Sequence, residues 1–561
     1  MKMIFNRNIL GGVLALLGAI AVLPSCKKFD NPPPVFEDLI VKNPEARKIL
    51  VISIDGTTGS ELKTIAPPNI MELVPNAKYS FATFKSAVST DAASWVSMVT
   101  GATYNKHLVS QGNFQPTPAE GAGEHDGVPI RRNVLDLIMS VKDTKTAFIT
   151  PWDSLRNYVR IANYTPIVST DVAVKDSTVN LLGKYSQLST VVVNFREVEA
   201  AGANGGYVAT NTVYKDAILK ADGYVKEIIN AVKARKTYDK EDWLIVITTN
   251  HGGSGTNPSP GFLFACHPLF KSLEMKKEGF NTVLFAGNNI IASVPNDNGL
   301  YSASNDKDFT VQAQIRVAKP STGYVTFFSK GNGYPNSPTV RTGWAWGTWL
   351  NQWRMYHTAG FNATDQGNIS DGTWHTLTTT VKRVNATTRT AQNYFDGVPS
   401  ASPINWGTTN LTTAEPLRIG FRPGSSGTAL EFYMANLAYF QTALDPTVIQ
   451  NNLNLKNITQ HPNFSSLIGF WKMDEGAEGV FQNTAPTGYD MVIGGPYAWS
   501  SLGTNSPSQS TVNPSTGAYS FQPSSADIGA LMMYWLNVKV LPDYDISGKP
   551  FIKEFEPEFI K

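Results

Sequence analysis

Three short segments carry side chains that could hold a cation or attack a substrate. Asp55 ends the apolar run at residues 48–56, and Asn250-His251 follows the apolar run at residues 243–249. Thr90-Asp91 lies in a segment rich in Ser, Thr and Ala. Carboxylate, amide and imidazole groups bind divalent cations, and a hydroxyl group beside a cation can act as a nucleophile.

The apolar runs predict a parallel β-sheet that would bring these segments together. Residues 48–56, 190–195 and 243–249 are continuously apolar, which is typical of central parallel strands. Residues 213–234 form an amphipathic helix pattern between the last two runs, which completes a strand–helix–strand unit. Ligands usually lie at the carboxyl ends of such strands. The fold class predicted for this part is α/β.

The middle of the chain has a different pattern. From about residue 300 to residue 495, short alternating strands with Gly, Asn and Thr turns replace the helix patterns, which predicts an all-β sandwich. A helix pattern returns at residues 526–536, and too few residues remain there for a separate domain. We therefore predict that the sandwich is inserted into the α/β domain. The predicted parts are residues 45–295 and 519–561 for the α/β domain, 296–497 for the insert and 498–518 for a linker.

The order of the three polar segments resembles the alkaline phosphatase superfamily, nearest to its nucleotide pyrophosphatase/phosphodiesterase branch. The segment from Asp527-Ile528 to Gly548-Lys549-Pro550 resembles the closing segment of that family. The resemblance implies a two-zinc site in which a Ser or Thr hydroxyl attacks a phosphoryl group. It also implies roles for the residues at the matching positions. Asp91 stands at the nucleophile position with Thr90 just before it, so Thr90 and Asp91 are the candidate catalytic residues. The matching metal ligands are Asp55, Asp91, Glu199, Asn250 and His251, and Asn113 matches a phosphate contact.

Several matching positions lack the expected ligand. Asn250 stands in place of an aspartate, Ala203 in place of a histidine, and residues 500–561 contain no histidine. We therefore expect no two-zinc site, and at most one divalent cation, such as Ca, Mg or Zn. Two interpretations of Thr90 stay open, a nucleophile or a helix cap. Glu199 could equally be a solvated carboxylate.

The sandwich segment resembles the laminin-G/concanavalin A-like jelly roll. Six elements in order carry the resemblance, among them Gly372-Thr373-Trp374-His375, Tyr394-Phe395-Asp396-Gly397 and Phe470-Trp471-Lys472. Such domains often bind sugars or proteins, although a fold alone does not establish a function. Four tryptophans lie within twelve residues and could stack on sugar rings or pack inside the protein; they are Trp344, Trp346, Trp349 and Trp353.

The N-terminus has the pattern of an export signal. Residues 9–23 are an uncharged and mostly apolar run after Lys2 and Arg7, too short to span a bilayer comfortably. Leu23-Pro24-Ser25-Cys26 resembles the lipobox of bacterial lipoproteins, which implies that Cys26 is lipidated. Residues 26–44 would form a tether. We expect an outer-membrane, lipid-anchored protein that is held at the bilayer through Cys26.

Composition limits the other partners. The net charge is +2, from 47 basic and 45 acidic residues, so no basic excess suggests a nucleic-acid partner. The leading hypothesis is an envelope lipoprotein of a Bacteroides-like bacterium, with a non-catalytic phosphodiesterase-like domain and a jelly roll that binds a glycan, peptide or protein. The alternatives are a divergent metal-dependent phosphodiesterase or phosphatase, and an accessory subunit of an outer-membrane nutrient-uptake complex.

Overall fold

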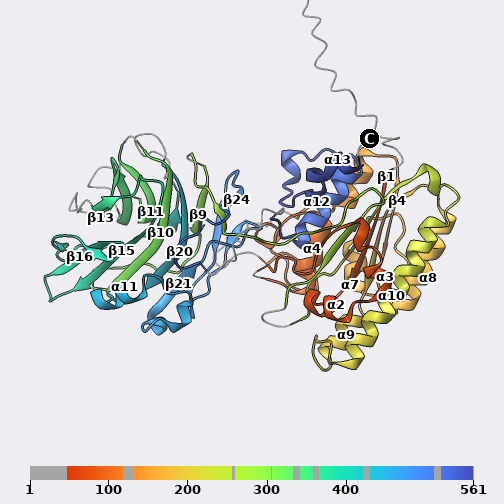
Figure 1. The fold of residues 1–561 in the computed structure, drawn as a ribbon, viewed down its shortest axis with the longest axis horizontal. Coiled ribbons are helices and arrows are strands. Elements are labelled where there is room, and N and C mark those ends of the chain that lie inside the picture. The colour runs from red at the N-terminus through yellow and green to blue at the C-terminus, as the bar shows by residue number, and fades with distance from the viewer. Residues whose placement is uncertain are drawn as a thin grey trace, which may run out of the picture.

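The protein consists of two lobes, an α/β domain built from both ends of the chain and a β-sandwich built from the middle (Figure 1). The computed structural model describes residues 47–559 except 87, 118–129, 255–258, 288, 305, 322, 333–341, 358–365, 421–429 and 511–519. Cys26, the predicted signal peptide and the tether lie outside the described residues. Within the described residues, no helix is long and apolar enough to cross a membrane.

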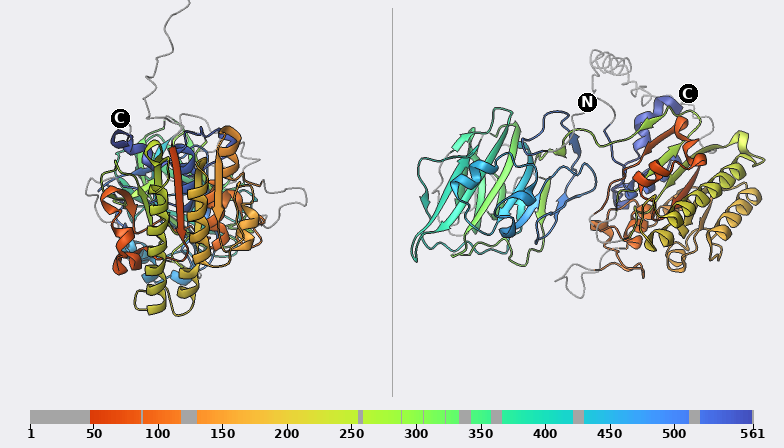
Figure 2. Two further views of the ribbon diagram at one scale, coloured as in Figure 1. Left: turned by 90° about the vertical axis from the view of Figure 1, so that its right-hand side faces the viewer. Right: turned by 60° about the horizontal axis from the view of Figure 1, so that its bottom comes forward.

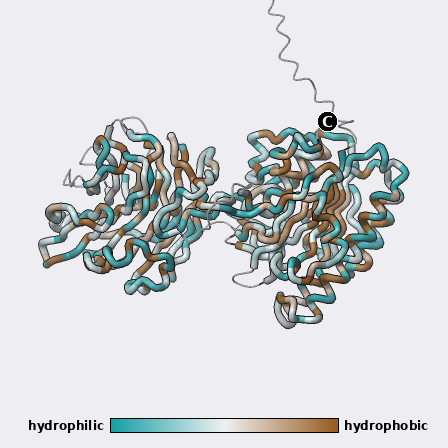
Figure 3. Tube along the Cα trace, viewed as in Figure 1, coloured by the Kyte–Doolittle hydropathy of each residue, from teal (hydrophilic) through white to brown (hydrophobic). Residues whose placement is uncertain are grey.

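The α/β domain is organised around one seven-stranded sheet with the order β3-β4-β1-β5-β6-β2-β7. Its strands are β1 (Arg47–Ile54), β2 (Ala77–Ser80), β3 (Lys145–Ile149), β4 (Leu188–Phe195), β5 (Asp242–Thr248), β6 (Leu263–Cys266) and β7 (Leu273–Glu274). The first four in the order are parallel, whereas β6 runs antiparallel to both of its neighbours. Every residue of β1 and β4 is buried, which explains their continuous apolar sequences (Figure 3).

Helices cover both faces of this sheet. Side chains alternate along each strand, so successive residues of β1 contact helices on opposite faces. Ile49 and Val51 of β1 pack with α4 (Asp91–Thr100), α6 (Val134–Val141) and α12 (Ser525–Trp535). Leu50 and Ile52 pack instead with α8 (Asp171–Lys184) and α10 (Thr212–Lys233), which lie side by side in Figure 2. The shorter helices of this domain are α2 (Gly59–Ile65), α3 (Pro68–Met71), α5 (Tyr104–His107), α7 (Asp153–Tyr158), α9 (Glu197–Ala203) and α13 (Glu556–Phe559). The helix α11 (Pro446–Asn452) belongs to the insert.

The close contact between α4 and α12 joins the two ends of the α/β domain. A Cβ atom on Gly529 would lie 2.7 Å from the backbone nitrogen of Gly101, so the glycine allows the two helices to approach. Ser547 and Gly548 donate backbone hydrogen bonds to the carbonyl group of Gly101. The segment after the sandwich therefore completes the domain that begins before it, which confirms the predicted insertion.

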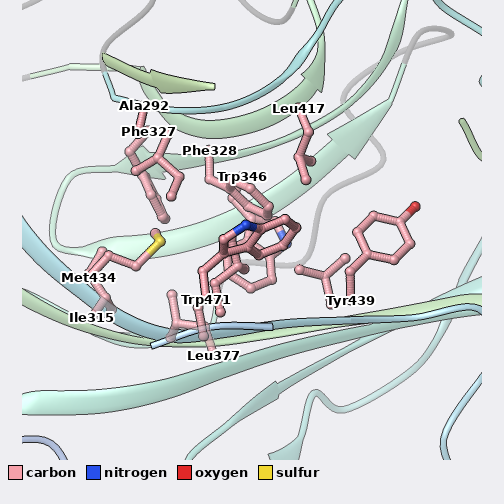
Figure 4. Packing of buried hydrophobic residues seen from close by; sticks show 14 of the residues in the cluster. Ala292, Ile315, Phe327, Phe328, Trp346, Leu377, Leu417, Met434, Tyr439 and Trp471 are labelled. Atoms are coloured by element: carbon pink, nitrogen blue, oxygen red, sulfur yellow. The ribbon is translucent and has the colours of Figure 1, made fainter. Parts of the chain in front are cut away.

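The insert is a sandwich of two antiparallel sheets. One sheet is centred on β10 (Phe309–Lys319), β15 (Trp374–Arg383) and β20 (Glu431–Phe440), and the other on β11 (Val325–Gly331), β12 (Gly343–Trp349) and β13 (Gln352–His357). Buried aromatic and aliphatic side chains fill the space between them (Figure 4). The remaining strands are β14 (Gln366–Asn368), β16 (Arg389–Phe395), β17 (Val398–Pro399), β18 (Ile404–Asn405), β19 (Leu417–Ile419), β21 (Leu467–Trp471), β22 (Val480–Phe481) and β23 (Met491–Gly494).

The junction between the lobes is a two-stranded ribbon that the sequence did not indicate. β8 (Asn281–Val283) pairs with β24 (Trp499–Ser501), which lies inside the predicted linker. β9 (Ile291–Val294) already belongs to a sheet of the sandwich, so the sandwich begins before the predicted boundary at residue 296. The chain thus enters and leaves the insert through paired strands.

Candidate functional site

The candidate site lies at the carboxyl ends of the central parallel strands. Asp55 directly follows β1, Arg196 directly follows β4, and Asn250 and His251 follow β5 after one residue. Asp91 is the first residue of α4, whose amino end points at the same edge of the sheet. The parallel topology therefore brings together residues that are up to about two hundred positions apart.

Asp55 is fully buried and already has its hydrogen bonds. Its Oδ1 accepts from the Ser53 hydroxyl at 2.6 Å, and its Oδ2 accepts from Trp95 Nε1 at 2.9 Å and from Arg196 Nη1 at 3.2 Å. Burial raises the pKa of Asp55 to about 6, although the guanidinium of Arg196 opposes that shift. Three donors therefore bind this carboxylate, and its role as a metal ligand stays a prediction.

Asp91 is held by three donors from two other segments. Its Oδ2 accepts from Arg196 Nη2 at 2.7 Å, and its Oδ1 accepts from Asn250 Nδ2 at 2.6 Å and from His251 Nε2 at 2.7 Å. The Nδ1 of His251 accepts the Gly253 amide, so the proton of the imidazole lies on Nε2. Burial disfavours the charged carboxylate, but His251 and Arg196 outweigh it and hold the pKa of Asp91 far below its usual range.

Arg196 is the central residue of the site, and the sequence analysis did not single it out. Its guanidinium binds both Asp55 and Asp91, and its Cζ lies 4.6 Å from the centre of the Trp152 ring. Burial lowers the pKa of Arg196, but the two carboxylates outweigh burial and raise it. A permanent positive charge therefore stands between the two carboxylates that the resemblance assigned to metal binding.

Asn250 donates a hydrogen bond to Asp91. Its carbonyl oxygen accepts from the backbone amides of Gly56 at 3.2 Å and of His251 at 2.7 Å, which fixes the orientation of the amide group. Its Nδ2 therefore points to Asp91. The prediction that the Asn250 carbonyl holds a cation stays a prediction, and such a cation would share that oxygen with two backbone N–H groups.

Glu199 lies close to Asp91 and His251, as predicted. One ligand atom from each of these three residues lies within 4.8 Å of the others, the geometry of a small metal site. The Oε1 of Glu199 accepts from the Tyr207 hydroxyl, while its buried Oε2 has no hydrogen-bond partner. Within the described residues this is the cluster that could hold one divalent cation.

A two-zinc centre does not fit this arrangement. Each zinc ion needs about three charged or imidazole ligands and an open position for substrate. Here Arg196 occupies Asp55 and Asp91, Asn250 offers only donors to the site, and Tyr207 covers one oxygen of Glu199. Only one histidine, His251, contributes to the cluster.

Thr90 is the N-cap of α4. Its Oγ1 accepts from the Ala93 amide at 3.2 Å and donates to the Ser110 carbonyl at 2.8 Å. This is the capping interpretation that the sequence left open, and it directs the hydroxyl proton to a backbone oxygen rather than to a base. The nucleophile interpretation has no support from these contacts.

Asn113 lies in the loop that follows α5. Its Oδ1 accepts from the Gln115 amide at 3.0 Å, and its side chain borders a separate cavity lined also by Arg131 and Tyr158. The phosphate contact of Asn113 stays a prediction. The local hydrogen bond to Gln115 is an Asx turn, which shapes the loop that carries Asn113.

The tryptophan cluster of the insert is mainly core. Trp344, Trp346 and Trp353 are 0–1% exposed and pack between the two sheets, as Figure 4 shows for Trp346. The prediction that these three bind a ligand is wrong, because no ring face reaches solvent. Trp349 is partly exposed and stacks on Tyr324 at 4.1 Å between ring centres. The prediction of ligand contact stays open only for Trp349.

Comparison with protein families identifies the insert. Residues 287–450 match a model described as the concanavalin A-like lectin/glucanases superfamily. The insert is a concanavalin A-like domain. This match and the two-sheet sandwich together confirm the predicted jelly-roll part of the chain. The sequence matches no curated protein at a significant level.

Similar solved structures include a phosphodiesterase and a sulfatase of the alkaline phosphatase superfamily. Murine ectonucleotide pyrophosphatase/phosphodiesterase 5 is 13% identical, with 37% of this chain and 57% of that chain covered and a TM-score of 0.30. A 2-O GAG sulfatase is 11% identical, with 41% and 65% covered and a TM-score of 0.32. A Bacteroides ovatus protein described as carbohydrate-binding is 12% identical, with 47% and 69% covered and a TM-score of 0.31. The chain thus spans less than two thirds of the first two proteins.

Proposed function

We propose that this protein is a lipid-anchored envelope protein whose α/β domain is a non-catalytic scaffold and whose concanavalin A-like insert binds a glycan or a protein. The observation that carries the proposal is the position of the Arg196 guanidinium between Asp55 and Asp91. In the resembled family, a cation would neutralise these carboxylates. Here a side chain of the protein supplies the positive charge.

The electrostatics of the site support this interpretation. A divalent cation at Asp55 and Asp91 would lie next to a guanidinium, and two like charges a few ångströms apart repel by several kcal/mol where water is excluded. The carboxylates also stabilise the charged form of Arg196, so the protein does not release this proton near neutral pH. Metal binding at Asp55 would therefore first require displacement of Arg196.

A hydrolase would also need an activated nucleophile. Thr90 donates its proton to a backbone carbonyl, and the imidazole of His251 is bound to Asp91 and to the Gly253 amide. Neither group is arranged as a nucleophile with an adjacent base. These contacts support a scaffold role over phosphoryl transfer.

The second candidate is a divergent metal-dependent phosphodiesterase or phosphatase, and one observation favours it. Glu199 is 7% exposed, and its Oε2 has no partner in the described structure. A buried carboxylate oxygen without a donor is costly unless something binds it. A single cation at Glu199, Asp91 and His251 would meet that requirement.

Hydrolysis of bis(4-nitrophenyl) phosphate distinguishes the two candidates. The purified full chain is assayed with Mg²⁺, Ca²⁺, Mn²⁺ or Zn²⁺, together with the Thr90→Ala variant and a Ser110→Ala control that keeps the Thr90 hydroxyl and the backbone carbonyl it binds. The scaffold proposal predicts no metal-stimulated rate above that of the buffer. A rate that Thr90→Ala abolishes and Ser110→Ala retains would establish the enzyme.

The envelope location is tested separately. In a bacterial expression host with lipoprotein processing, fed with labelled palmitate, the wild-type chain should incorporate label, and Cys26→Ala should incorporate none. A glycan array with wild-type protein and Trp349→Ala then tests the binding role of the insert. The partner would otherwise be a peptide or a neighbouring outer-membrane protein, as in a nutrient-uptake complex.

A further inference from the structure

A cavity opens on the α/β domain beside α4, and the residues that line it do not include Asp91 or Arg196. Its volume is about 490 Å³, within the range of small-molecule sites in proteins. The loop between α5 and residue 117, together with α7, forms its wall. All residues that line the cavity belong to the described part of the chain, and none of them is acidic.

The polar lining is basic and rich in amide groups. Arg131 and Arg160 border the cavity together with Asn113, Gln115 and Asn157. Arg131 is fixed in place, since its Nη1 lies 2.6 Å from Asp545 Oδ2 and its Nε donates to the Lys106 carbonyl at 3.1 Å. Within the described residues Arg160 has no ion-pair partner, so its guanidinium is available to an anion.

The apolar part of the wall is aromatic. The rings of Phe114 and Tyr158 stack with centres 4.9 Å apart, and Phe114 also contacts Trp152 at 5.1 Å. Phe114 adopts a left-handed backbone with φ of +58°, which is unfavourable for a bulky residue. Leu108, at the other end of the same loop, is also left-handed, with φ of +53°. Such strain is found most often where a loop is shaped for a ligand.

We propose that this cavity binds a small anionic saccharide. Its carboxylate or sulfate group would bind Arg160 and Arg131, since a planar guanidinium matches such oxygens with paired hydrogen bonds. The amide groups of Asn113 and Asn157 would bind hydroxyl groups. The apolar face of the sugar ring would lie on the partly exposed ring of Tyr158, which stacks on the buried ring of Phe114. The site belongs to the α/β domain and does not depend on ligand binding by the insert.

Calorimetric titration of the full-length protein with D-glucuronate at low salt tests the proposal, with D-glucose as the neutral probe of similar shape. We expect glucuronate to bind at least tenfold more tightly than glucose, and 0.5 M NaCl to weaken it. Arg160→Gln should weaken glucuronate binding about tenfold, because a hydrogen bond to a charged group is lost. Arg160 is exposed, so this variant should fold normally.

Two matched variants complete the experiment. Arg132→Gln removes a nearby exposed arginine that pairs with Asp136 and does not line the cavity, and it should leave the affinity unchanged. Trp349→Ala alters the insert and should also have no effect. The proposal is overturned if glucuronate does not bind, if glucose binds equally well, or if Arg160→Gln keeps full affinity. If Trp349→Ala loses glucuronate binding while Arg160→Gln keeps it, the sugar binds to the insert, and the proposal is likewise overturned.

Discussion

Replacing Arg196 with alanine removes the only cation beside Asp55 that the described structure provides, and the consequence depends on pH. Asp55 has a folded-state pKa of about 6 against 3.8 for the free residue, so the folded state binds more protons and stability falls as the pH rises between those values. Without the guanidinium the folded pKa rises further. Up to the raised pKa of the variant, each pH unit above 6 then lowers the unfolding free energy of the variant by about 1.4 kcal/mol more than that of the wild type.

The expected loss of unfolding free energy follows from these slopes. At pH 5.5, Asp55 is mostly protonated in both proteins, and the variant loses only the hydrogen bond to Asp91, about 1 kcal/mol. At pH 8, the unpaired charge of Asp55 adds up to about 2.7 kcal/mol to this loss, so the unfolding free energy of Arg196→Ala should fall by about 3–4 kcal/mol in total. This range agrees with the cost of breaking a buried ion pair. Partial exposure of Arg196 and Asp91, 24% and 27%, favours its lower end.

Urea denaturation at pH 5.5 and at pH 8.0 measures this difference. Arg132→Ala is the matched control, since its exposed pair with Asp136 should contribute no more than about 0.5 kcal/mol at either pH. In the double variant Arg196→Ala/Asp55→Asn, the extra loss of unfolding free energy at pH 8.0 should disappear, because the titrating carboxyl group of Asp55 is gone. An equal loss at both pH values, or a loss no greater than that of the control, would refute the assigned role of Arg196.

Three further predictions concern other parts of the structure. Glu478 lies beside Ser86 at the contact between the lobes, and burial raises its pKa to about 7. Its buried carboxylate is charged at pH 8 and neutral at pH 4.5, so Glu478→Gln should unfold at a higher temperature than the wild type at pH 8 and at a similar temperature at pH 4.5. A lower unfolding temperature of the variant at pH 8 would contradict this. Trp346→Ala should destabilise the insert by about 3–5 kcal/mol and Trp349→Ala by about 1 kcal/mol or less, measured by thermal unfolding; equal losses would mean that their burial is misjudged. Gly56→Ala should cost about 1–3 kcal/mol in urea, because Gly56 has φ of +76° and a Cβ atom would lie 2.2 Å from Glu199 Oε2, whereas Gly183→Ala, with open space around it, should be neutral or stabilising.

The sequence predicted the strands well, because strands that are buried on both faces must be continuously apolar. It also predicted that Asp55, Asp91 and His251 would converge, since parallel strands place their carboxyl ends at one edge. It did not predict the role of Arg196. The available signal was its position directly after Phe195, at the carboxyl end of β4, which lies between β3 and β1. A long side chain at that edge can reach either neighbouring strand, so its partners depend on packing that the sequence does not specify.

The tryptophans were misjudged for a different reason. Trp344 and Trp346 are two residues apart on β12, so they share one face of the sheet. The small residues Ala345 and Gly347, which follow each tryptophan, occupy the other face, an alternation that is typical of a strand packed on a core. Residue type suggested sugar stacking, whereas the period of two indicated burial. The burial of Trp344 and Trp346 confirms the second signal.

Elemental analysis of the purified, full-length wild-type protein tests the central claim most directly. The protein is expressed in medium supplemented with zinc, manganese and calcium, and tightly bound metal is measured after gel filtration by inductively coupled plasma mass spectrometry. Because Arg196 supplies the charge between Asp55 and Asp91, we predict far less than one metal ion per chain, and an increase in Arg196→Ala. Two tightly bound ions per wild-type chain would contradict the account.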